Sequence, residues 1–152
     1  MGIISRFKDI MSANINALLD KAEDPEKMVD QYLRNLEGDL AKVKQETASV
    51  MAEEAKAKRQ LDECTAEVAK MQSYAEKAVL AGNDEDAKRF LMKKKELVVK
   101  QTSLQETYTL AAENAAKMRQ MHQKLVGDIS QLNSRRDAIK AKIAVAKTQQ
   151  TI

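Results

Sequence analysis

Apolar residues recur at alternating intervals of three and four along most of the chain, and this spacing constrains the fold more than any other feature. One run extends from Val29 to Ala78 and a second from Ala87 to Ala146. Such spacing marks the seam of a coiled coil, in which each helix packs one apolar stripe against a neighbouring helix. The sequence therefore predicts two long helices that each bury a single stripe.

A short segment without this spacing separates the two runs. Glycine suits the left-handed residue that ends many helices, and Asn or Asp caps the start of the next helix. The segment Ala81-Gly82-Asn83-Asp84 has these residue types in this order. We therefore predict a tight turn near residues 81–84, formed by Gly82, Asn83 and Asp84.

The two runs match when the second is folded back on the first at this turn. Leu33 then faces Leu132, and Ala75 faces Phe90. The heptad phase and the turn thus give the same register, and large residues face small ones in several layers, as packed cores prefer. The prediction is a long antiparallel two-helix coiled-coil hairpin. Because such a hairpin leaves most of its surface in water, we also expect it to self-associate into a homo-oligomer.

Composition supports an all-α fold. The 152 residues include two Phe, three Tyr and no Trp, and 32% are charged, which leaves too little apolar material for a thick globular core. Four Gly and one Pro leave few turns, which excludes β-sheets.

The first 24 residues form a second amphipathic pattern. Asp24 and Pro25 separate it from the hairpin, because the residue before proline is pushed out of the helical region and proline favours the first position of a new helix. We therefore divide the chain into an amphipathic helix over residues 1–24, a hinge at Asp24 and Pro25, and the hairpin over residues 25–152. The apolar stripe of the first helix consists of Ile3, Ile4, Phe7, Ile10, Met11, Ile15, Leu18, Leu19 and Ala22.

Two surfaces could cover this stripe. On a bilayer, each apolar side chain would contribute at most about 1.5–3 kcal/mol, and Arg6 and Lys8 would add roughly 1 kcal/mol each near anionic lipid. Alternatively, the stripe packs on the hairpin. A segment that leaves the hairpin when a membrane is available would do both.

Catalytic chemistry has little support in the sequence. Catalysis needs convergent groups, and this chain has one His, one Cys and no glycine-rich phosphate loop. His122 falls on the predicted seam opposite Val43, as a core or edge residue. We expect no enzyme activity, no metal site and no cofactor. A net charge of only +3, with mixed signs, also argues against a nucleic-acid partner.

Location is predicted from what the sequence lacks. No apolar run approaches the roughly 18 residues of a membrane span. The N-terminal stretch is also a poor signal peptide, because Asp9 interrupts its apolar residues. A lone Cys64 has no intramolecular disulfide partner, which fits a reducing compartment. We expect a cytoplasmic protein.

A basic cluster lies just after the turn. It either forms a solvated face with interhelical ion pairs, as charge runs on coiled coils usually do, or contacts an acidic partner or phosphate groups. The cluster consists of Lys88, Arg89, Lys93, Lys94 and Lys95. Lys94 falls on the seam itself, where it either fixes the register or reaches solvent along its flexible stem.

The opening run MGIISRFKDIMSANINALLDKAEDPEKMV, followed by a long hairpin with an acidic tip, resembles the phage-shock protein A family, which includes the vesicle-inducing protein in plastids. The resemblance covers essentially the whole chain. It implies an ESCRT-III-like membrane-remodelling protein that forms homo-oligomeric rings and rods and protects the bacterial inner membrane under stress. It also implies lipid binding by the N-terminal helix. That role carries over to Ile3, Ile4, Phe7, Ile10, Met11, Ile15, Leu18 and Leu19, although family members commonly have an aromatic residue where this chain has Ile4.

The resemblance leads to a functional expectation with one alternative. We expect a self-assembling scaffold, peripheral on the inner face of the cell membrane, that binds anionic phospholipid. The alternative is a negative regulator of transcription that binds and inhibits an AAA+ enhancer-binding activator through the hairpin. Relatives carry further C-terminal helices, so a chain that stops at Ile152 leads us to expect a fragment of a longer family member.

Overall fold

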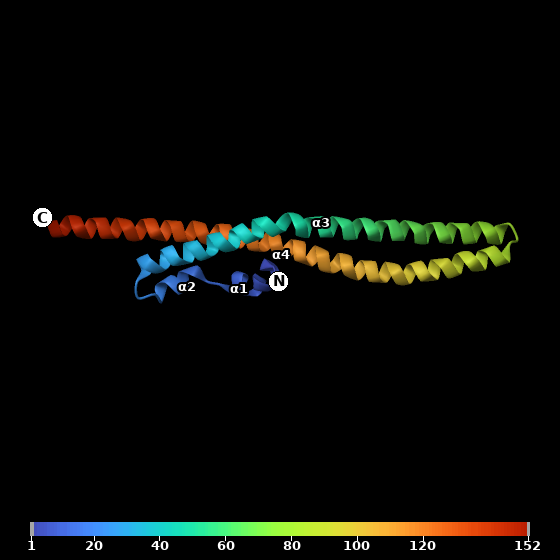
Figure 1. The fold of residues 1–152 in the computed structure, drawn as a ribbon, viewed down its shortest axis with the longest axis horizontal. Helices are drawn as coiled ribbons and strands as arrows, with labels where there is room; N and C mark the ends of the chain where they lie inside the picture. The colour runs from blue at the N-terminus through green and yellow to red at the C-terminus, as the bar shows by residue number, and fades with distance from the viewer. Residues whose placement is uncertain (1, 152) are drawn as a thin grey trace. The chain divides into compact units, whose positions relative to one another are not determined.

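The computed structural model describes the backbone of residues 2–151 and the side chains of residues 2–150. Within that range every regular element is helical, which confirms the all-α prediction. Figure 1 shows two long helices joined at one end and a short N-terminal segment beside them. The elements are the 3-10 helix η1 (Ile3–Arg6), α1 (Phe7–Ser12), α2 (Ile15–Asp20), α3 (Pro25–Leu80) and α4 (Asp84–Thr151).

The turn between α3 and α4 satisfies the backbone groups that two helix ends leave open. Gly82 has φ +77°, the left-handed conformation, and its N–H donates to the carbonyl of Val79 at 3.0 Å. The N–H of Asn83 donates to the carbonyl of Ala78 at 2.8 Å, so the end of α3 is a Schellman motif. The Asn83 side chain then accepts from the Asp86 N–H at 3.2 Å and caps α4.

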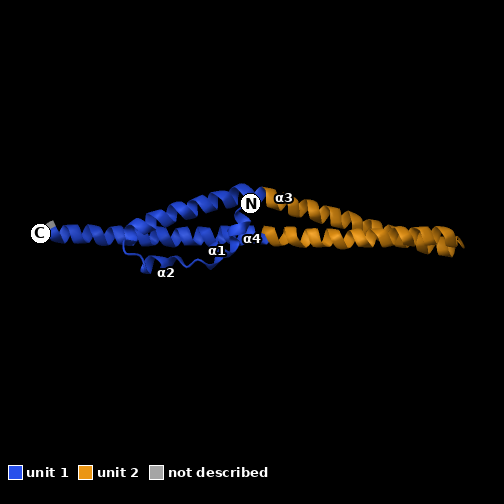
Figure 2. Ribbon diagram, turned by 60° about the horizontal axis from the view of Figure 1, so that its bottom comes forward, with its two compact units in different colours: residues 1–48, 116–152 blue, residues 49–115 orange. Residues whose placement is uncertain are grey.

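The chain divides into two compact units, coloured separately in Figure 2. The first contains residues 1–48 and 116–152, and the second contains residues 49–115. In each unit a part of α3 packs against a part of α4, as the predicted hairpin requires.

The second unit is a two-helix coiled coil with the turn at one end. The rings of Tyr74 and Phe90 lie 5.4 Å apart between centroids, and the Cys64 thiol donates to the carbonyl of Leu97 at 3.3 Å. Gln101 donates across the seam to Thr65 at 2.9 Å. These contacts agree with the predicted antiparallel register.

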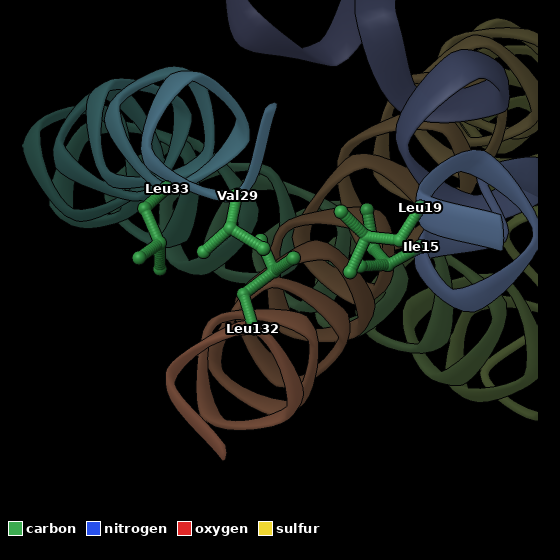
Figure 3. Packing of buried hydrophobic residues seen from close by; sticks show 5 residues of the cluster. All are labelled: Ile15, Leu19, Val29, Leu33 and Leu132. Atoms are coloured by element: carbon green, nitrogen blue, oxygen red, sulfur yellow. The ribbon is translucent and has the colours of Figure 1, made fainter. Parts of the chain in front are cut away.

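The first unit has a third layer, because the N-terminal segment packs on the two long helices. Figure 3 shows Ile15 and Leu19 from α2 pointing toward side chains of α3 and α4. Side chains of α2, α3 and α4 together form one buried apolar cluster. Leu33 and Leu132, which the predicted register places opposite each other, both belong to it. The buried members of the cluster are Ile15, Leu19, Val29, Leu33 and Leu132.

The N-terminal segment differs from the single helix expected over residues 1–24. It begins as the 3-10 helix η1, continues as α1 and then breaks, because Ala13 has an extended backbone with ψ 132°. Asn14 is also extended, and its side chain accepts from the Ala17 N–H at 3.1 Å, so it caps α2 as a new helix. The segment is therefore a broken helix when it lies on the hairpin.

The third layer also changes which residues of α4 are buried. Met121 is fully buried, whereas His122, predicted to lie on the seam, is exposed. Lys117, Met121, Lys124 and Asp128 follow one another at intervals of three and four, so they share a face of α4. Lys117 and Lys124 both contact the N-terminal segment. This face is a second stripe, turned toward that segment rather than along the two-helix seam.

Candidate functional site

The candidate functional site is the N-terminal segment with the faces of α3 and α4 that hold it. Four of its stripe residues are buried, with exposed fractions between 1% and 4%: Ile3, Ile10, Ile15 and Leu19. Ile4, Phe7 and Met11 are half-buried. Leu18 is 41% exposed, and the cationic Lys8 is exposed as well. The hairpin thus covers most of the predicted lipid-binding stripe.

A first polar contact ties the start of the segment to α3. The Arg6 guanidinium pairs with the carboxylate of Asp39, whose side chain is only 8% exposed, while the Arg6 side chain is 49% exposed. A buried carboxylate needs such a partner, because an unpaired buried charge is strongly destabilising. Arg6 is therefore tied at its head group and still accessible to solvent.

About two helical turns further along, α3 holds the first residues of the segment. The N–H of Ile3 donates to the Glu46 carboxylate at 3.0 and 3.3 Å. A Cβ atom on Gly2 would lie 1.9 Å from Oε1 of the same carboxylate. Gly2 therefore permits the close approach that this contact requires.

Residues of α4 hold the rest of the segment. The ammonium group of Lys117 lies 5.4 Å from the centroid of the Phe7 ring, within the range of a cation–π contact. Further along, Arg135 donates to Asn16 at 3.3 Å and to Asp20 at 3.1 Å. Contacts from both long helices therefore orient the segment along its length.

The break between α1 and α2 has its own contact. The extended Ala13 carbonyl accepts from Lys124 Nζ at 2.8 Å, and the same ammonium group pairs with Asp128 one turn further along α4. Both side chains are largely buried in this arrangement. The carbonyl that a continuous helix would bond internally is thus bonded to α4 instead.

The predicted hinge lies where the segment joins α3. Asp24 accepts from the Lys27 N–H at 3.3 Å through its side chain and from the Met28 N–H at 3.1 Å through its carbonyl. Pro25 is the first residue of α3. Asp24 and Pro25 therefore start α3 through contacts with α3 itself, and their role as a hinge stays a prediction.

The basic cluster after the turn is partly neutralised within the second unit. Arg89 pairs with Asp86, and Lys93 lies 3.7 Å from Glu96. Lys94 donates across the seam to Gln72 at 2.8 Å. Lys88 and Lys95 are exposed. The five residues therefore have different surroundings in the structure, and their contact with a partner stays a prediction.

Two further features limit the chemistry of residues 2–151. No helix among them has an apolar stretch long enough to span a bilayer. No three of their His, Cys, Asp and Glu side chains are grouped as metal ligands would be.

Fold and site together define a class: coiled-coil hairpin proteins with a short helical N-terminal segment folded onto their arms. The sequence pattern of the PspA/IM30 family matches residues 2–152, and the chain belongs to that family. The family resemblance seen in the sequence is thereby confirmed.

Individual relatives agree with this assignment. The chain is 65% identical to the phage shock protein A homolog of Bacillus subtilis, over 99% of this chain and 66% of that protein. It is 28% identical to the membrane-associated protein Vipp1 of Nostoc punctiforme, over 100% of this chain and 59% of the relative. Protein LiaH of Bacillus subtilis is 27% identical over 97% and 66% of the two chains. The chain thus spans between about half and two thirds of the length of its relatives.

Proposed function

We propose that this protein is a peripheral membrane-binding, self-assembling scaffold that maintains or remodels the cytoplasmic membrane under envelope stress. The observation that carries the proposal is the position of the apolar stripe. It lies on a short segment whose covalent connection to α3 is the linker of residues 21–24. The segment can therefore leave the hairpin without unfolding α3 or α4. The names of two relatives, a membrane-associated protein and a phage shock protein A homolog, support the same function.

When the N-terminal segment leaves the hairpin for a bilayer, burial against the hairpin is exchanged for burial in lipid. Leaving the hairpin exposes Ile3, Ile10, Ile15 and Leu19, each of which loses about 1.5–3 kcal/mol of burial. A bilayer would bury the same four side chains again. It also covers Leu18, which the hairpin leaves exposed. Arg6 and Lys8 add about 1 kcal/mol each near anionic lipid. An anionic membrane therefore competes with the hairpin for the segment.

Self-assembly is proposed from the surface of the second unit. Large apolar side chains point outward along its part of α4, where Met92 is 68% and Val99 is 69% exposed. Leu110 is exposed as well. Apolar groups repeated along one helix commonly mark a surface that another protein covers. A second copy of the hairpin is the partner we propose.

Leu18 provides the sharpest test of membrane binding. Its side chain is exposed on the hairpin but belongs to the lipid-facing stripe, so Leu18→Glu leaves the folded form intact and removes one anchor. We expect vesicle affinity to fall about tenfold or more in flotation with anionic lipid, from the loss of about 1.5–3 kcal/mol. Ser12→Glu is the control, because it adds the same charge at an exposed position off the stripe. Equal flotation of the two variants would argue against the proposed function.

A second candidate function is inhibition of an AAA+ activator through the hairpin. It is favoured by exposed Lys88 and Lys95 beside exposed Leu91 and Met92, a combination of charge and apolar surface that suits a protein partner. A pull-down with such an activator and an ATPase assay tests it. Unchanged hydrolysis at saturating hairpin would count against this function.

A further inference from the structure

The contacts that hold the N-terminal segment differ in whether the positively charged residue belongs to the hairpin or to the segment. Lys117, Lys124 and Arg135 are cations of α4, and they remain on the hairpin when the segment leaves. Arg6 is different, because it belongs to the segment and pairs with Asp39 of α3. Among the contacts of the described residues, this is the ion pair whose cation would travel with the segment to a membrane.

Arg6 is also the partner that a phosphate group can reach. A guanidinium group binds carboxylate and phosphate with the same paired hydrogen-bond geometry. Since half of the Arg6 side chain is exposed, a phosphate can approach it before the segment has moved. Asp39 is shielded beneath it at 8% exposure. The geometry therefore permits a direct exchange of one anion for the other.

We propose that Asp39 keeps the segment folded on the hairpin and that the phosphate groups of anionic lipid release it by taking over Arg6. This inference rests on the proposed membrane-binding function and adds its regulation. On a neutral membrane, the segment would have to expose its buried apolar stripe before any favourable contact with lipid formed. An anionic surface replaces the Arg6 ion pair first, so it lowers the cost of the first step. Release then depends on the charge of the membrane as well as on its presence.

The remaining contacts are consistent with this order. After release, Lys124 keeps its pairing with Asp128, because both residues lie on α4. The carbonyl of Ala13 can then accept a bond within a continuous helix, whose formation on lipid aligns the stripe on one face. Asp39 is the group that loses its partner, and it becomes hydrated once the segment no longer covers it. The ion pair with Arg6 is therefore the contact that a lipid phosphate replaces directly.

The test compares Asp39→Asn with Glu37→Gln in the full chain. Both substitutions remove one negative charge from α3, so they change general attraction to anionic vesicles equally, but Glu37 is exposed. The first measurement is hydrogen exchange of residues 3–20 without lipid. The second is flotation with phosphatidylglycerol vesicles and with phosphatidylcholine vesicles as separate arms, and the hydrogen exchange of residues 3–20 is repeated with each vesicle and with inorganic phosphate. For Asp39→Asn we expect exchange in residues 3–20 to accelerate about fivefold. We expect anionic vesicles at sub-saturating lipid to bind about fivefold more tightly than they bind Glu37→Gln.

Each outcome decides a separate point. Identical exchange and binding in the two variants would overturn the role of Asp39. If inorganic phosphate releases the segment from the hairpin as completely as vesicles do, a lipid surface is not the trigger. If Asp39→Asn loosens the segment while no form binds either vesicle, the proposed function and the exchange with lipid are both wrong. In a last case, Asp39→Asn loosens the segment, but the wild type binds neutral and anionic vesicles equally strongly. This result would overturn the exchange of Asp39 for lipid phosphate at Arg6, and it would leave the proposed membrane binding intact.

Discussion

Lys124 Nζ lies 2.8 Å from the carbonyl oxygen of Ala13, a residue 111 positions earlier in the chain. The contact joins α4 to the break between α1 and α2, so the broken form of the N-terminal segment depends on the hairpin. Asp128 pairs with the same ammonium group and is itself largely buried. The conformation of the segment and its docking are therefore parts of one arrangement.

Replacing Lys124 with Met should loosen this arrangement. The substitution removes the bond to Ala13 and leaves the Asp128 carboxylate buried without its cation, so we expect docking to weaken by about 2 kcal/mol. Hydrogen exchange of residues 13–20 measures the effect. The double variant Lys124→Met with Asp128→Leu should recover part of the loss, because no unpaired charge remains. A single variant that exchanges like the wild type would contradict this role for Lys124.

Replacing Asn14 with Ala should favour the membrane form at the expense of the docked form. The change removes the cap of α2, at a cost of about 1 kcal/mol, and places a better helix former in the middle of a continuous helix. We expect about tenfold tighter binding to anionic vesicles, with more helix by circular dichroism when vesicles are added. Ser12→Ala is the control, since Ser12 does not cap α2. Weaker vesicle binding by Asn14→Ala would show that the break is needed on lipid too.

Two glycines should respond to alanine in opposite directions. In Gly2→Ala the new Cβ displaces the Glu46 carboxylate, which weakens its bond to the Ile3 N–H by about 1 kcal/mol. Gly38 lies within α3 with open space around it, so Gly38→Ala should stabilise the protein by about 0.5–1 kcal/mol. Amide exchange at Ile3 reports the first effect and thermal unfolding reports the second. Faster exchange at Ile3 in both variants would argue against the specific role of Gly2.

The turn should tolerate asparagine better than alanine at residue 82. Gly82 has φ +77°, a conformation that costs other residues about 1–2 kcal/mol, and asparagine visits it more readily than alanine. Gly82→Ala should therefore lower the Tm by about 2–4 °C per kcal/mol lost, and Gly82→Asn should lower it less. Equal Tm values for the two variants would contradict this account of the turn.

The hairpin could be predicted because its signals repeat. Every seam position from Val29 onward reports the same helical phase, and the glycine at residue 82 stands where the two runs meet. The broken N-terminal segment could not be predicted with the same method. Regular spacing from Ile3 to Ala22 favours one helix, and the competing signal was a single residue, Asn14, whose capping preference is small beside that periodicity.

The polar side of the site escaped prediction for a different reason. Asp39 and Lys124 are charged residues beside a coiled-coil seam, and such residues normally face water. They are buried here because a third layer covers them, and a two-helix pattern contains no information about that layer. The burial of Met121 in place of His122 has the same cause. An apolar methionine next to the seam was the available sign that α4 has a second covered face.

The apolar cluster of the first unit is shared among α2, α3 and α4, so it cannot survive unchanged when one contributor departs. Without Ile15 and Leu19, the side chains of Val29 and Leu132 lose part of their cover and meet water. If the N-terminal segment transfers to a bilayer, as proposed, it would uncover an apolar strip on α3 and α4 that the docked segment covers. On the proposed function, this strip would be open to a neighbouring molecule only where lipid has already been met, and it would add to the apolar side chains that the second unit exposes in either form.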